Sequence, residues 1–119
     1  MFDVLEAEIE GLRIPVDGAA LRKAHRLLDR FAAKVSEADG EFDAAGMWEP
    51  EGATSMANWL RYEARQSGGK AASDAKIAEA LRSLPVTAVA WRSGELSGAQ
   101  VQAIVANVPR RHRELFASH

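Results

Sequence analysis

Apolar side chains recur every three or four residues along most of the chain, which is the period of an amphipathic helix. The first stripe is short and predicts a helix within residues 1–14. This helix ends near Gly11, because Ile14 precedes Pro15 and a residue before proline is disfavoured in helical conformation. The stripe consists of Phe2, Leu5, Ile9 and Leu12.

The longest periodic segment begins after Asp17 and predicts one long helix over residues 18–45. Two interpretations of its apolar seam are open: packing inside the same bundle, or pairing with a second copy in a coiled coil. Leu27 and Ala32 stand where a coiled coil would carry complementary charges, so the stripe is wide and packing within the bundle is the preferred interpretation. The seam consists of Leu21, Ala24, Leu28, Phe31, Val35, Ala38 and Phe42.

The polar side of this long helix carries its charges in an unfavourable order. Basic residues occupy the first half and acidic residues the second, which is the reverse of the order that the helix dipole favours. Either an acidic partner helix or a bound anion would compensate this order. Gly40 also interrupts the pattern, at a cost of roughly 1 kcal/mol relative to alanine, and marks a place where the helix can bend. The charged residues are Arg22, Lys23, Arg26, Arg30 and Lys34, then Glu37, Asp39, Glu41 and Asp43.

Shorter helices are predicted over the region 54–119. One is capped by Thr54 or Ser55, and the next starts at Ser67 or Ser73 and ends before Pro85. A third runs from Pro85 to Ser93, with Gly94 ending it. The fourth, over residues 98–107, has the clearest signal, a capping box of Ser97 and Gln100 with Leu96 and Val101 at the spacing of a hydrophobic staple. A last segment begins at Pro109.

The two helices across residues 55–83 have the proportions of a helix-turn-helix, in which the second helix lies in the major groove of DNA. Lys70 and Lys76 would then face phosphates or bases. Short breaks between helices also occur in ordinary bundles, which is the alternative interpretation. Arg110, Arg111 and Arg113, in a helix beginning at Pro109, form a second candidate for a polyanion contact.

Composition agrees with the helical pattern and reveals an asymmetry of charge. Alanine, the best helix former, is abundant, and cysteine is absent, so disulfides and thiolate chemistry are excluded. The net charge of −2 is the sum of an acidic first part and a basic second part. Residues 1–51 carry 6 basic and 12 acidic side chains, whereas residues 52–119 carry 9 and 5. A basic half favours a surface that faces a polyanion, with a merely solvated face as the alternative.

The residue types that catalysis requires do not occur together in this sequence. The three histidines are scattered, and neither a metal-ligand spacing nor a phosphate-binding glycine loop is present. Serines lack a candidate base. Trp48, Trp59 and Trp91 are expected to be buried anchors, although Trp91-Arg92 could form a stacking platform for bases. We therefore expect no enzymatic activity, metal site or cofactor in this chain, and no membrane span, which indicates a cytoplasmic protein.

The stretch from Phe42 to Val108 resembles a known family, the domain of unknown function 222, in four blocks that occur in family order. This family is found mainly in actinobacteria and often precedes an HNH endonuclease domain. The resemblance implies that this chain is the N-terminal, non-catalytic part of a longer protein, or a short stand-alone member of the family. The four blocks are Phe42-Asp43 before Gly46 and Trp48, then Gly52-Ala53-x-Ser55 leading to Trp59-Leu60, then Ala80-Leu81-x-x-Leu84-Pro85, and last Gly94-Glu95-Leu96-Ser97.

These observations predict an all-α fold, a single domain over residues 1–119 built as a bundle of five or six helices around one long central helix. The expected function is that of a non-catalytic accessory domain that binds or positions double-stranded DNA for an HNH-type endonuclease. The expected phosphate contacts are Lys70, Lys76, Arg82, Arg92, Arg110, Arg111 and Arg113. The alternative is a protein-interaction or dimerisation module without nucleic-acid contact, which self-associates through Leu21, Leu28, Phe31, Val35 and Phe42.

Overall fold

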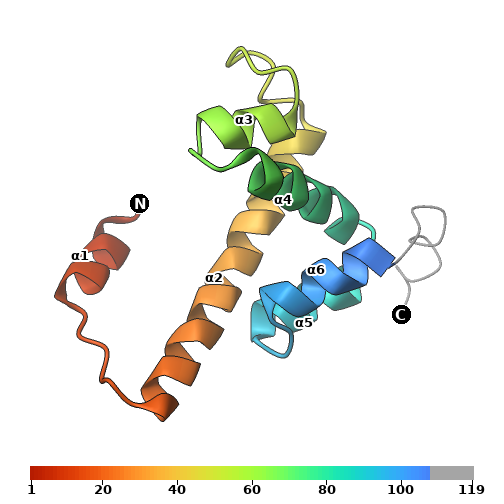
Figure 1. Ribbon diagram of the computed structural model, residues 1–119. Coiled ribbons are helices and arrows are strands. Elements are labelled where there is room, and N and C mark those ends of the chain that lie inside the picture. Colours follow the sequence, from red (N-terminus) through yellow and green to blue (C-terminus); the bar gives the residue numbers. More distant parts are fainter. Residues whose placement is uncertain (108–119) are drawn as a thin grey trace.

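The computed structural model describes residues 1–107, and these form six helices with no strand among them. This arrangement confirms the all-α fold and the long central helix (Figure 1). The segment after Pro109 lies outside the described residues. The helices are α1 (Asp3–Gly11), α2 (Gly18–Ala44), α3 (Met56–Tyr62), α4 (Gly68–Leu81), α5 (Pro85–Ser93) and α6 (Gly98–Asn107).

Side-chain caps set the starts of α2, α3 and α4. The Asp17 carboxylate accepts a hydrogen bond from the Ala20 amide at 2.8 Å, and the Ser55 hydroxyl accepts one from Asn58 at 3.0 Å. Ser67 caps α4 by accepting from the Lys70 amide at 3.2 Å, which decides between the two possible starts of that helix. Each cap satisfies an amide that has no partner within its helix.

The connection between α5 and α6 follows the sequence signals closely. Gly94 ends α5 with φ of 87°, a conformation that glycine adopts without the steric penalty of a side chain. Ser97 and Gln100 form the predicted capping box, since the Ser97 amide donates to the Gln100 side chain at 2.9 Å and the Gln100 amide donates to the Ser97 hydroxyl at 3.1 Å.

The centre of the domain is α4, which packs against α2, α3, α5 and α6. Its alanines allow close approach on several sides, and Ala71, Ala78 and Ala80 are buried. Two apolar clusters meet α4. The larger contains Ala33, Ile77, Ala80, Trp91, Val101 and Val105. The smaller contains Met56, Leu60 and Ala71, with Phe42, Trp48, Trp59 and Ala75 packed on it.

The face of α2 that packs in the bundle is not its apolar seam. Ala33, Ser36 and Gly40 are the buried residues of α2, on the side roughly opposite the seam. These small residues let α4 and α5 approach the α2 backbone. A Cβ at Gly40 would lie 3.0 Å from the Ala78 carbonyl oxygen, so glycine is needed here for close packing between helices.

The expectation that the seam packs inside the bundle is therefore wrong over residues 21–35. Leu28 is 63% exposed and Phe31 49% exposed. At the C-terminal end of the seam the expectation holds, because Phe42 is half-buried with its ring centroid 4.7 Å from that of Trp59. Apolar periodicity shows that one face of a helix favours burial, but it does not show which element covers that face.

The first helix stands apart from the bundle. Figure 1 shows α1 joined to the start of α2 by the linker and separated from the other helices. None of its residues is buried, and it makes no extensive contact with any other helix. The apolar stripe predicted for this helix is therefore also exposed.

Candidate nucleic-acid interface

The basic residues predicted on α4 do not form one surface. Lys70, Lys76 and Arg82 follow one another at intervals of six residues, and each interval turns the helix by about 240°. They therefore point in different directions around α4 and its C-terminal end.

Lys70 is also engaged by acidic side chains. Its Nζ lies 2.9 Å from Asp74 Oδ2. The charges of Lys70 and Asp74 also act on Asp39. Burial raises the pKa of Asp39, the negative charge of Asp74 raises it further, and the positive charge of Lys70 lowers it in part. These groups border a cavity of about 550 Å³. Because its neighbours are acidic, Lys70 presents little net positive charge.

Arg82 and Arg92 are brought together, but beside acidic residues. Both line a groove of about 400 Å³ that also contains Glu37 and Glu41. Arg92 Nη1 lies 3.4 Å from Glu37 Oε2. This groove has no excess of positive charge among these four side chains.

A recognition helix must present one long face to DNA, and α4 does not. Packing on four other helices leaves α4 a narrow exposed stripe that includes Ala72, Lys76 and Glu79, with Lys70 outside it. The predicted cluster of Arg110, Arg111 and Arg113 lies outside the described residues.

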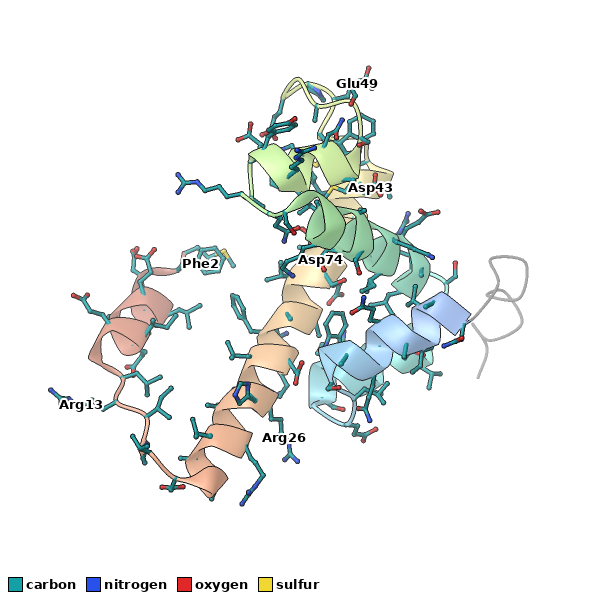
Figure 2. The ribbon with its side chains drawn as sticks, in the orientation of Figure 1. Phe2, Arg13, Arg26, Asp43, Glu49 and Asp74 are labelled. Atoms are coloured by element: carbon teal, nitrogen blue, oxygen red, sulfur yellow. The ribbon has the colours of Figure 1, made fainter. Side chains whose placement is uncertain are left out.

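A separate basic surface lies on the first half of α2. Arg22, Arg26 and Arg30, which we call the α2 basic row, are four residues apart and therefore on one side of the helix. All three are exposed. Figure 2 shows Arg26 extending from this half of α2.

The basic row borders the turn between α5 and α6. A Cβ at Gly94 would lie 3.2 Å from Arg26 Cγ and 3.3 Å from Arg30 Cδ, so the turn packs against the arginine stems. Arg30 Nε donates to the Arg92 carbonyl oxygen at 3.3 Å. These contacts hold the stems of two long side chains while their guanidinium groups stay at the surface.

A groove of about 500 Å³ runs between the row and this turn, and Arg22, His25 and Arg26 line one side. Asp29 and Glu95 are the acidic residues of the groove. Asp29 is already used, because its Oδ1 accepts a hydrogen bond from the Gly98 amide at 2.8 Å. The N-terminus of α6 is thereby occupied by a protein carboxylate and is not open to an anion.

The α2 basic row is not among the DNA contacts predicted from the sequence. The signal that could have found it was the reversed charge order of the long helix, which called for an anion or an acidic partner. The row could not be told from the other basic residues until the structure showed which arginines share an exposed side.

The tryptophans do not form a platform for bases. Trp91 is buried, 6% exposed, as part of the larger apolar cluster, which confirms the expected anchor role. Trp48 and Trp59 are half-buried, and their indole N–H groups donate to Asp43 at 3.0 Å and Glu51 at 3.2 Å. Stacking of a base on Trp91 would require opening the core.

Within residues 1–107, no group of three or more histidine or acidic side chains is placed to hold a metal ion. No helix in this part of the chain is long and apolar enough to cross a membrane.

The fold and surface define a small all-α domain in which a long helix carries an exposed basic row and an exposed apolar seam. The chain belongs to the family called domain of unknown function 222 (DUF222), which it matches over residues 16–114. The helix α1 precedes the matched region. No curated protein and no solved structure matches the chain.

Proposed function

We propose that this domain is a non-catalytic accessory domain that holds double-stranded DNA by its phosphates and positions it for an HNH-type endonuclease. The observation that carries the proposal is the α2 basic row, three exposed arginines on one side of a rigid helix. The association with a nuclease rests on the sequence resemblance described above.

The chemistry of the row suits a phosphate backbone. Three guanidinium groups are distributed over about 12 Å, since each interval of four residues rises about 6 Å along a helix. Arginine pairs with phosphate through parallel hydrogen bonds and keeps its charge at every physiological pH. Contacts of this kind fix DNA in place without reading its sequence.

The residues predicted from the sequence have unequal parts in this proposal. Arg92 contacts the row through its backbone carbonyl, which accepts from Arg30, while its side chain pairs with Glu37. Lys76 and Arg82 are peripheral, and Lys70 is neutralised by Asp74. Arg110, Arg111 and Arg113 remain proposed contacts.

The test is the binding of a fluorescently labelled duplex at low salt, followed by anisotropy. The variant Arg22→Gln/Arg26→Gln/Arg30→Gln should bind about tenfold more weakly than wild type or worse, because three counterion-releasing contacts are removed. The control variant Arg13→Gln/Arg61→Gln/Arg65→Gln removes the same charge from exposed positions elsewhere and should lose much less affinity. Equal losses in the two variants, or no binding by wild type at micromolar protein, would contradict the proposal.

A second candidate function is a protein-interaction module without nucleic-acid contact. The exposure of the α2 seam favours it, since large uncovered apolar patches on small proteins usually mark binding surfaces. Of the residues expected to self-associate, Leu21, Leu28, Phe31 and Val35 are exposed, whereas Phe42 is largely covered by the bundle.

A further inference from the structure

We propose that two copies of this chain form a dimer by exchanging their first helices, so that α1 of each copy packs on the exposed seam of α2 of the other. This inference rests on the second candidate function and is independent of DNA binding. It names the partner of the apolar surface as a second copy of the same chain.

Both helices present apolar stripes that the single chain leaves uncovered. On α1 and the two residues that flank it, Phe2 is 56% exposed, Ile9 63% and Leu12 62%. On α2 the exposed residues are Leu21, Leu28, Phe31 and Val35. A helix of nine residues is marginal in water unless its apolar side packs on something. The helix α1 therefore needs a partner surface, and the seam needs a cover.

Charge identifies the two surfaces as partners. The helix α1 carries four acidic residues and no basic one, namely Asp3, Glu6, Glu8 and Glu10. Along α2, Lys23 and Lys34 border the seam, close to Leu27 and Phe31 on the helix surface. An acidic helix lying on this half of α2 supplies the negative charge that its reversed charge order lacks.

The linker between the two helices is extended, and α1 does not pack on its own bundle. Leu12 is extended, with ψ of 132°, and so is Asp17. Pro15 keeps Ile14 out of helical conformation. Six residues, 12–17, reach up to about 20 Å when extended, so the linker is long enough for α1 to reach the seam of its own chain or that of a second copy. In the structure no residue of α1 is buried on its own α2, and Figure 2 shows Phe2 at the start of α1.

An exchange of this kind is closed and leaves the basic row free. Each copy gives one α1 and receives one, so a two-fold dimer covers both stripes of both chains. Arg22, Arg26 and Arg30 border the α5–α6 turn, away from the seam. The dimer would therefore present two basic rows.

The first test exchanges charges between chains and uses sedimentation equilibrium. Wild type should dimerise at about 100 µM or below. Glu6→Lys/Glu10→Lys in one chain, and Lys23→Glu/Lys34→Glu in another, should each weaken the dimer by about tenfold, because attractive pairs become repulsive. An equimolar mixture of the two variants should recover the wild-type affinity, since each reversed α1 then meets a reversed α2. Packing of α1 on its own α2 gives no recovery.

The second test uses the absence of cysteine from the natural chain. Chains with Ile9→Cys and chains with Leu28→Cys are mixed and treated with a short bismaleimide. The expected product contains one chain of each kind, whereas Ala72→Cys, at an exposed position on α4, should not cross-link to Ile9→Cys.

A wild-type dimer without the mixed product would overturn the exchange but leave an interaction function standing. A protein that stays monomeric at about 100 µM would overturn the inference altogether. The Arg22→Gln/Arg26→Gln/Arg30→Gln variant should dimerise like wild type, so dimerisation and DNA binding are tested independently of each other.

Discussion

At the scale of single residues, small and acidic side chains decide how α2 sits in the bundle. Gly40 brings the α2 backbone against α4, and Asp29 holds the first amide of α6. Neither residue belongs to an apolar stripe. From the sequence alone, Gly40 is expected to destabilise the helix. The structure shows that glycine is needed there, because the Ala78 carbonyl lies too close for a side chain.

The replacement Gly40→Val should destabilise the domain by about 2 kcal/mol, because the added atoms must displace the Ala78 carbonyl or the Arg82 stem. Gly69→Val is the matched control, since a Cβ at Gly69 meets no atom within 4 Å. Urea unfolding measures both free energies. A Gly40→Val midpoint equal to the control would show that α2 and α4 are not in close contact here.

The half-buried Asp39 should make stability depend on pH. Its pKa is raised above 3.8 by burial and by Asp74, so the folded state holds this proton more tightly than the unfolded state. The unfavourable contribution is therefore absent below pH 3.8 and develops as pH rises through the raised folded-state pKa. Asp39→Asn should be more stable than wild type at pH 7 and no more stable at pH 3, as measured by thermal unfolding at the two pH values. A gain of equal size at both values would argue against ionisation as the cause.

At the scale of elements, helix ends were predictable from the sequence, because caps are local. Ser55, Ser97 and Gly94 act where the pattern placed them. The partners of the helices were not predictable, because they depend on residues far apart in the chain. The contact between Asp29 and Gly98 spans 69 positions, and no local rule links the two.

Loss of this contact should loosen α6. Asp29→Ala removes a charge-assisted hydrogen bond and leaves the Gly98 amide without its protein acceptor, at a cost of about 1–2 kcal/mol. Hydrogen exchange of the first amides of α6 should become faster than in wild type, while exchange in α3 should stay unchanged. The exposed α1 residue Asp3 offers a control, since Asp3→Ala should leave exchange in α6 unchanged.

At the scale of the whole molecule, α2 has three surfaces with different tasks. Small residues of its second half face the bundle, arginines of its first half form the basic row, and apolar residues on the other side form the uncovered seam. The sequence shows all three residue types, but it does not show which of them packs in the bundle. The seam is the most apolar surface of α2, so from the sequence it is expected to be buried. The α2 basic row was missed because the net charge points to residues 52–119 as the basic part of the chain. In the structure, basic residues of that part such as Lys70 and Arg92 lie beside acidic side chains.

The salt dependence of duplex binding tests most directly whether the basic row binds DNA phosphates. The logarithm of the affinity falls linearly with the logarithm of salt concentration, with a slope of about 0.9 per phosphate neutralised. Wild type and the Arg22→Gln/Arg26→Gln/Arg30→Gln variant should therefore differ in slope by about 2.7, while the control triple variant should keep a slope close to that of wild type. Identical slopes for all three proteins would contradict a DNA-binding role for the α2 basic row.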